Sequence, residues 1–233
     1  MPHKPIPPTQ PPGDHAEELL AIVAHELRRP LTALLAALAT LQQHDRALSA
    51  LQQQELLGLA RQQGAQLQRL LGQLLAAAGV DRGYARLARR SLVDAAALAE
   101  EACRAARLAY PDHRVTIEVA GPLLIRVDPL AVSRILGNLL DNAAAHAPEG
   151  TPIAVSARRD GVHAVLAVQD DGPGILPADR ERIFDRYTRL EKPAASLAGG
   201  LGLGLYIARR LARANRGELQ VTDPLIAVEP PWL

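Results

Sequence analysis

Residues 24–32 read Ala-His-Glu-Leu-Arg-Arg-Pro-Leu-Thr and place a histidine directly before a carboxylate in a leucine-rich segment. Apolar residues recur here with heptad spacing, at Leu20, Ala24, Leu27, Leu31, Leu34, Leu38 and Leu41. That spacing is typical of a coiled coil or a helical bundle. His25 follows the seam position Ala24 and is therefore rotated about 100° from the buried face. Such a histidine can take part in chemistry, although a His-Glu pair taken alone is more often an ordinary solvated helix position.

The composition predicts helices packed through aliphatic side chains, because 48% of the 233 residues are hydrophobic and only 3% are aromatic. The formal charge of +1 argues against a nucleic-acid partner. The single cysteine, Cys103, excludes an internal disulfide and fits a reducing compartment. No apolar run approaches the roughly 20 residues of a membrane helix, and the N-terminus lacks the apolar core of a signal peptide. We therefore expect no membrane segment in this chain and a cytoplasmic location.

The N-terminal part of the chain predicts a tail followed by a helical hairpin. Residues 1–13 contain six prolines and are expected to be an extended tail or linker. Residues 14–83 are expected to form a domain of two helices, the first capped by Asp14 and ending near His44, the second ending near Ala78. A hairpin of this size has too little core to stand alone. Two copies paired across a two-fold axis would give a homodimeric four-helix bundle.

Residues 84–233 predict a second domain, in which helices and strands alternate. Helices are expected at residues 94–110, 129–147 and 204–214, and strands at 114–119, 123–127, 153–158, 163–169 and 218–222. This order indicates an α/β sandwich with helices on one face of a mixed sheet. The last strand pair is expected to be shortened or rebuilt, because Pro224, Pro230 and Pro231 cannot lie in a central strand.

Three polar or glycine-rich segments of the second domain have the chemistry of a nucleotide site. Asn138 and Asn142 are four residues apart on one helix face, and amide oxygens can ligate a hard cation such as Mg²⁺. Residues 170–174, Asp-Asp-Gly-Pro-Gly, follow a strand; Asp170 can accept a hydrogen bond from an adenine amine, although the segment can also be a simple turn. Residues 199–205, Gly-Gly-Leu-Gly-Leu-Gly-Leu, open a helix whose N–H groups can bind phosphate. The last segment is neither a P-loop nor a dinucleotide fingerprint.

In this order, the segments resemble the catalytic core of bacterial two-component sensor histidine kinases. The similarity covers residues 17–222 and includes a phospho-acceptor box, an N box, a first glycine box, an F box and a second glycine box, at residues 25–32, 138–142, 170–174, 183–189 and 200–204. The resemblance implies a dimerisation and phosphotransfer bundle followed by an ATP-binding sandwich of the type shared with gyrase, Hsp90 and MutL.

The resemblance implies that the γ-phosphoryl group of ATP passes to a ring nitrogen of His25. Glu26 would orient the imidazole and accept its proton, as a carboxylate can. The phosphoryl group would then pass to an aspartate of a response regulator receiver domain.

The resemblance also implies ATP and Mg²⁺ as ligands, with Asn142 holding the metal and Asn138 assisting. Asp170 would read adenine, and the glycine boxes would bind phosphates. Arg189 or Lys192 would contact the γ-phosphate, and residues 176–198 would form a mobile lid. The predicted nucleotide-binding residues are Asn138, Asn142, His146, Asp170, Gly172, Gly174, Arg189, Gly200, Gly202 and Gly204.

Some positions depart from the family pattern. Arg29 stands four residues after the histidine, where many relatives have Thr or Asn to position water, so we expect weak or absent phosphatase activity. Ala145 replaces a common basic residue, which removes a phosphate contact, while His146 can still stack on adenine. Pro30 cannot donate a hydrogen bond to the carbonyl of Glu26, so the helix is expected to bend there and help present His25 to its partners.

Two other functions compete with the kinase. One is an ATPase of the same superfamily without histidine phosphorylation; the other is a catalytically weak dimeric adaptor that binds response regulators. The His-Glu pair argues against the first, and the nucleotide segments argue against the second. The stimulus is not readable from these residues.

Overall fold

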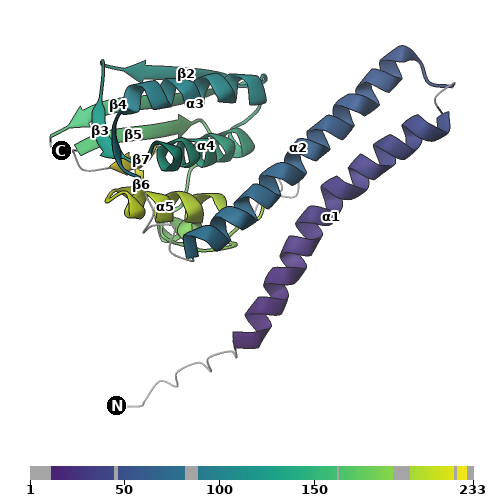
Figure 1. Ribbon diagram of the computed structural model, residues 1–233, viewed down its shortest axis with the longest axis horizontal. Coiled ribbons are helices and arrows are strands. Elements are labelled where there is room, and N and C mark those ends of the chain that lie inside the picture. Colours follow the sequence, from purple (N-terminus) through teal and green to yellow (C-terminus); the bar gives the residue numbers. More distant parts are fainter. Residues whose placement is uncertain are drawn as a thin grey trace. The chain divides into compact units, whose positions relative to one another are not determined.

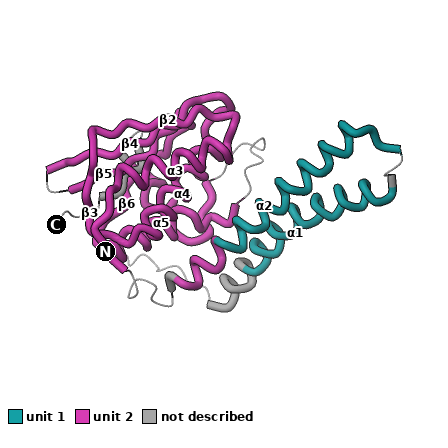
Figure 2. Tube along the Cα trace, turned by 45° about the horizontal axis from the view of Figure 1, so that its top comes forward, with its two compact units in different colours: residues 1–72 teal, residues 73–233 magenta. Residues whose placement is uncertain are grey.

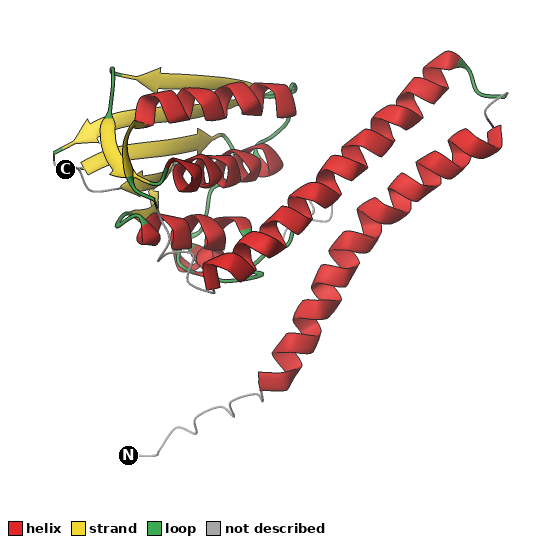
Figure 3. Ribbon diagram, viewed as in Figure 1, coloured by secondary structure: helices red, strands yellow, loops and turns green. Residues whose placement is uncertain are grey.

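The computed structural model describes residues 12–44, 47–81, 89–161, 163–190, 200–222 and 225–229. The chain divides into two compact units, residues 1–72 and 73–233, and each is described by itself (Figure 2). The first is helical. The second contains the end of the second long helix, the strands and three further α-helices (Figure 3). The predicted combination of a helical hairpin with an α/β domain is confirmed.

The hairpin consists of α1 (Pro12–His44) and α2 (Ala50–Asp81). A reciprocal capping box starts α2: the Gln52 N–H donates to Ser49 Oγ at 3.3 Å, and the Ser49 N–H donates to Gln52 Oε1 at 2.9 Å. The predicted cap of α1 is wrong, because α1 already begins at Pro12 and Asp14 lies inside it. Proline suits a first helical position, since its missing N–H would have no intrahelical partner there.

Pro30 lies inside α1, and the helix continues on both sides of it. The proline is buried, so the break in the hydrogen-bond ladder lies at a covered position. The bend predicted there stays a prediction.

The heptad seam of α1 is only partly covered within the chain. Leu27, Leu34 and Leu41 are half-buried, whereas Leu20 and Leu31 are exposed. A single hairpin has one inner face, so it cannot cover a seam as wide as a bundle helix presents. The inner face instead centres on other positions, which are Glu26, Pro30 and Ala37 of α1 and Ala60 and Leu70 of α2.

The second unit contains a mixed five-stranded sheet. Its order is β2 (Arg114–Val119), β4 (Pro152–Asp160), β5 (His163–Asp170), β7 (Leu225–Glu229) and β6 (Glu218–Thr222). The β2–β4 pair is parallel and the other pairs are antiparallel. A separate two-stranded sheet pairs β1 (Ser91–Asp94) with β3 (Leu124–Val127), and β1 had no counterpart in the sequence prediction.

Three helices cover one face of this sheet: α3 (Ala95–Ala109), α4 (Pro129–His146) and α5 (Gly204–Ala214) (Figure 1). The middle helix, α4, packs against both α3 and α5. Asp94 and Asp128 cap α3 and α4 by accepting the Ala96 and Leu130 N–H groups, each at 3.0 Å. Leu136 and Leu139 of α4 are almost fully buried, so α4 is held in place by its core side.

The last strand pair, expected to be shortened or rebuilt, forms a hairpin of two five-residue strands, β6 and β7. β7 forms and lies between β5 and β6, pairing with both. The strand residues Leu-Ile-Ala-Val-Glu contain no proline, because Pro224 and Pro230 lie just outside the strand. The proline rule therefore sets the ends of this strand and does not prevent it.

None of the helices in the described part of the chain combines the length and apolar character that a membrane span requires.

Candidate nucleotide and phospho-acceptor sites

The start of α5 lies against the N box on α4. A Cβ atom added to Gly204 would lie 3.7 Å from Asn138 Oδ1. Asn138 Nδ2 is buried and has no hydrogen-bond partner among the described residues. A buried amide donor without a partner is uncommon in folded proteins, and an acceptor on a bound ligand would satisfy it.

The first glycine segment closes against the C-terminal end of α4. The Gly172 N–H donates to Asp170 Oδ1 at 2.7 Å, which folds the loop back on the end of β5. A Cβ atom at Gly172 would lie 2.5 Å from Asp170 Oδ1 and 3.3 Å from the carbonyl oxygen of His146. A side chain at this position would have to displace the Asp170 carboxylate and would crowd the His146 carbonyl, so the loop lies close beside the end of α4.

The second glycine segment meets the F box. Gly202 has a φ of +63°, and a Cβ atom there would lie 2.7 Å from the carbonyl oxygen of Thr188. The Tyr187 N–H donates to the Gly202 carbonyl at 3.0 Å. Tyr187 itself has a φ of +60°, a left-handed conformation that is strained for a residue with a side chain.

The structure therefore brings together parts of all four predicted segments in the second unit, around α4 and the start of α5. Asn142 lies one helical turn after Asn138 and is half-buried. Gly174 has a φ of +71°, and both Gly174 and Gly200 have open space where a Cβ atom would be. Arg189 is exposed.

The predicted lid is only partly a loop. Its first half contains two short 3-10 helices, η2 (Pro177–Asp179) and η3 (Arg182–Phe184), and the side chains of Ile183 and Phe184 are buried. This half is packed structure, which corrects the expectation of a mobile segment from residue 176 onwards. Residues 191–199, with Lys192, lie outside the described residues.

On α1, His25 and Glu26 occupy different environments. His25 is exposed, whereas Glu26 is only 6% exposed. Adjacent helix residues point about 100° apart, which accounts for the difference. Arg29 is also exposed, one turn after His25 on the same side of the helix. The imidazole is thus accessible, and its neighbouring carboxylate belongs to the covered side of α1.

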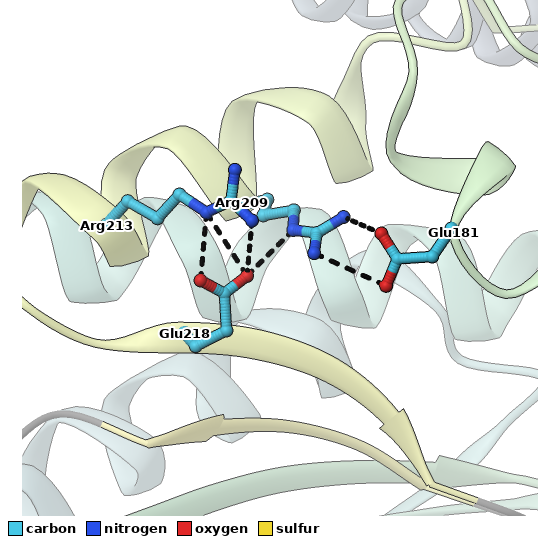
Figure 4. Close-up of polar contacts among 4 residues, drawn as sticks. All are labelled: Glu181, Arg209, Arg213 and Glu218. Atoms are coloured by element: carbon cyan, nitrogen blue, oxygen red, sulfur yellow. Dashed lines mark hydrogen bonds and ion pairs between the residues drawn. The ribbon is translucent and has the colours of Figure 1, made fainter.

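Sequence reasoning missed a charged cluster beside the F box (Figure 4). Arg209 of α5 donates to Glu181 at 2.7 Å and to Glu218 of β6 at 2.7 Å, and Arg213 donates to the same Glu218 at 2.8 Å. We call these four residues the Arg209 cluster. No short sequence motif predicts the Arg209 cluster, because Glu181 and Arg209 are 28 positions apart.

The cluster lowers the pKa of both carboxyl groups. The hydrogen bond from Arg209 lowers the pKa of Glu181, and the charge of Arg209 adds to this effect. Burial raises the pKa of Glu218, but hydrogen bonds from Arg213 and Arg209 outweigh burial, so the pKa of Glu218 is also lowered. Both groups are therefore held in their charged form.

Two family models match the chain. Residues 15–83 match the His Kinase A (phospho-acceptor) domain, and residues 127–229 match the histidine kinase-, DNA gyrase B- and HSP90-like ATPase. Together these matches show that the chain contains the catalytic core of a two-component histidine kinase. The second match makes the α/β unit of this histidine kinase core an ATP-binding domain.

Curated relatives are also histidine kinases or sensor proteins. The chain is 34% identical to the sensor protein IrlS of Burkholderia pseudomallei, over 84% of this chain and 41% of the relative. It is 31% identical to the signal transduction histidine-protein kinase/phosphatase MprB of Mycobacterium ulcerans, over 91% of this chain and 42% of the relative. The chain thus spans about two fifths of the length of these two relatives.

Solved structures of the family share the fold. A mycobacterial sensor histidine kinase MprB structure superposes with a TM-score of 0.53 at 28% identity, covering 61% of this chain and 97% of the other. Full-length ShkA in complex with AMPPNP superposes with a TM-score of 0.62 at 26% identity, covering 92% of this chain and 45% of the other.

Proposed function

We propose that this chain autophosphorylates His25 with ATP and passes the phosphoryl group to an aspartate of a response regulator receiver domain. The observation that supports it best is the meeting of Asn138, Gly172, Gly202 and Gly204 around α4, in a chain whose His25 is exposed beside a carboxylate. The residues that meet around α4 suit the binding of a nucleoside triphosphate. His25 supplies a nucleophile that can attack the terminal phosphorus of that triphosphate.

The chemical step is a phosphoryl transfer to nitrogen. A lone pair on a ring nitrogen of neutral His25 attacks the γ-phosphorus, a nitrogen–phosphorus bond forms, and the bond to the β–γ bridging oxygen breaks as ADP leaves. The proton on the other ring nitrogen passes to Glu26. Because Glu26 lies on the covered side of α1, this role requires its carboxylate to reach around the helix to the imidazole.

The residues present fit a Mg-nucleotide. Asn142 would hold Mg²⁺ through its amide oxygen. Asn138 would assist by donating from its buried Nδ2, which lacks a partner within the described chain, to an oxygen of the nucleotide. A bound Mg²⁺ would neutralise charge on the phosphates. The backbone N–H groups at the start of α5 would bind the phosphates, and Asp170 would accept a hydrogen bond from adenine. His146 is at the opposite end of α4 from the Asp128 cap, beside Gly172, where it can contact the base.

We also propose a homodimer formed through the hairpin. Several large apolar side chains of α1 remain exposed in the single chain, at Leu20, Leu31, Leu35 and Leu38. Their spacing places them along one side of the helix, and a second hairpin would cover them in a four-helix bundle.

The test is incubation with γ-labelled ATP and Mg²⁺, followed by measurement of acid-labile, base-stable label on the wild type and on His25→Gln. Label that requires His25 supports the kinase, and Glu26→Gln should then slow labelling by about 100-fold. Phosphate release without label would indicate the superfamily ATPase. Neither signal, with regulator binding retained, would indicate the adaptor.

Arg29 leads to a second proposal, that this kinase dephosphorylates its regulator poorly. Its exposed position one turn after His25 puts a long cation where a water molecule would have to be held. Phosphorylated regulator incubated with the wild type and ADP should lose phosphate little faster than alone, and Arg29→Thr should increase the rate. Rapid loss with the wild type would contradict the proposal.

A further inference from the structure

One arginine joins three parts of the ATP-binding domain. The Arg209 guanidinium donates from Nη1 and Nη2 to the Glu181 carboxylate at 2.7 and 3.4 Å, and from Nε to Glu218 at 2.7 Å. It also lies 4.5 Å from the centroid of the Phe184 ring, in cation–π geometry. α5, β6 and the segment that contains η3 are thereby fastened together by a single side chain (Figure 4).

The segment held by Arg209 contacts the second glycine box. Three residues after Phe184, Tyr187 donates its N–H to Gly202, and Thr188 lies where a side chain at Gly202 would have to be. The segment has only short 3-10 turns, whose hydrogen-bond geometry is poorer than that of an α-helix, so side-chain contacts contribute to its position. The strained φ of Tyr187 also persists only where the surroundings hold it.

A second contact supports the same attachment. Arg186 donates to Tyr206 Oη at 2.7 Å and lies 4.7 Å from its ring centroid. Tyr206 and Arg209 are three residues apart on α5, so both contacts tie residues 181–188 to one side of the helix that begins at Gly204.

We propose that Arg209 is a positioning residue for the phosphate end of the nucleotide. Within the described residues its hydrogen bonds go to Glu181 and Glu218, neither of which is a predicted ligand residue. It acts through Glu181 and Phe184, which set the position of Tyr187 and Thr188 and hence of the Gly202 backbone. This inference rests on the proposed function, because it assumes that the second glycine box binds phosphates. The adenine end, at Asp170 and Gly172, belongs to a different loop and should not depend on Arg209.

The contacts of Arg209 with Glu181 and with Phe184 differ in how much they stabilise the segment. The Glu181 side chain is 81% exposed, so its ion pair with Arg209 is screened by water and contributes modestly. The Phe184 ring is buried and the Arg209 side chain is only 16% exposed, so the cation–π contact is the better-shielded of the two. Removing Arg209 should therefore have a larger effect than removing the charge of Glu181.

Arg213 provides a matched control. It lies one turn after Arg209 on α5 and donates to the same carboxylate, Glu218, yet its hydrogen bonds in the described structure go to Glu218 alone. Arg213→Gln thus removes one charge and one contact with β6 without touching the F-box segment.

The experiment measures the affinity of the full chain for Mg-AMPPNP and for adenosine by calorimetry or competition, with thermal unfolding of each variant as a check on folding. Arg209→Gln should weaken Mg-AMPPNP by about tenfold, and Glu181→Gln by about threefold, since the first loses a shielded contact and the second an exposed one. Arg213→Gln should change the affinity for Mg-AMPPNP by less than about twofold. Adenosine affinity should stay within about twofold of wild type in all three variants, since no phosphate is involved.

Equal loss of Mg-AMPPNP and adenosine binding in Arg209→Gln would show a general structural role and overturn the proposal. Wild-type Mg-AMPPNP affinity in both Arg209→Gln and Glu181→Gln would overturn it as well. Glu181→Gln changes an exposed side chain and keeps the proposal testable if Arg209→Gln does not fold. Failure of His25 labelling in the wild type would instead count against the proposed kinase and leave these binding measurements interpretable.

Discussion

The two units of this chain bury their apolar residues very differently. The ATP-binding domain encloses a core in which side chains such as Ile135, Leu136 and Leu139 are at most 2% exposed. Four leucines of α1, at positions 20, 31, 35 and 38, are 41–69% exposed, whereas Leu70 of α2 is 2% exposed. The sheet domain encloses its core within one chain, whereas the hairpin leaves part of its apolar face uncovered, which favours the dimer proposed for the first unit.

The largest effect should come from charges placed on the exposed stripe of α1. Leu31→Glu combined with Leu38→Glu would bury two unpaired carboxylates at the proposed dimer contact, which should weaken dimerisation by at least about 100-fold. Sedimentation analysis over a concentration series measures this change. Leu108→Glu is the control, because Leu108 is 87% exposed on α3 of the other unit. A wild type that sediments as a monomer throughout would refute the assigned role of the hairpin.

Glycine substitutions in the second glycine box should have the next largest effect. Gly202→Ala imposes a side chain at a φ of +63° and only 2.7 Å from the Thr188 carbonyl oxygen. A cost of about 3 kcal/mol, typical of such strain, corresponds to about 100-fold weaker Mg-nucleotide binding if the segment shifts to relieve it. Gly200→Ala, with open space beside its α carbon, should bind within about threefold of wild type. Similar affinities for the two variants would show that Gly202 does not shape the site.

The same exchange of glycine for alanine should have the opposite sign in the hairpin. Gly58 lies inside α2, with nothing within 4 Å of an added Cβ atom. Alanine at this exposed helical position should raise the free energy of unfolding of the hairpin by about 1 kcal/mol, because glycine is the poorer helix former. Denaturant unfolding followed by circular dichroism checks it. A destabilised Gly58→Ala would indicate that this surface packs against a partner.

The smallest effect should appear in acid. Because the folded-state pKa values of Glu181 and Glu218 are lowered from the ordinary value of 4.5, their ionised forms stabilise the ATP-binding domain above that pH. That contribution is lost as the pH falls from 4.5 through the lower folded-state pKa values. The double variant Glu181→Gln, Glu218→Gln should therefore show a flatter dependence of thermal unfolding temperature on pH below 4.5. An unchanged slope would mean that the cluster does not contribute to stability.

Much of the fold was predictable because its signals are local. The strands at Arg114–Val119 and Glu218–Thr222 and the helix Gly204–Ala214 have the predicted bounds. The capping box at Ser49 and Gln52 was also readable from its spacing, although it was missed. β1 was missed for a different reason: its partner, β3, lies about 30 residues away, and four residues carry no local periodic signal.

For the candidate site, the identities of the residues were predictable from the sequence, whereas their contacts with one another were not. Residue types and order indicated Asn138, Asn142, Asp170 and the glycines, because nucleotide chemistry needs amides, a carboxylate and close backbone approach. Their contacts with one another, such as Gly204 with Asn138 and Gly172 with His146, depend on how α4 packs between α3 and α5.

The sequence by itself determined which residues are available: a histidine beside a carboxylate on an amphipathic helix, and glycine segments at the ends of a strand and a helix. Side-chain spacing and backbone preference are properties of neighbouring residues, so a sequence displays them directly. Only the tertiary structure decided that Glu26 is covered, that a strand forms between two prolines, and that Arg209 joins Glu181, Phe184 and Glu218. Those outcomes depend on contacts between residues far apart in the chain, which no local pattern encodes.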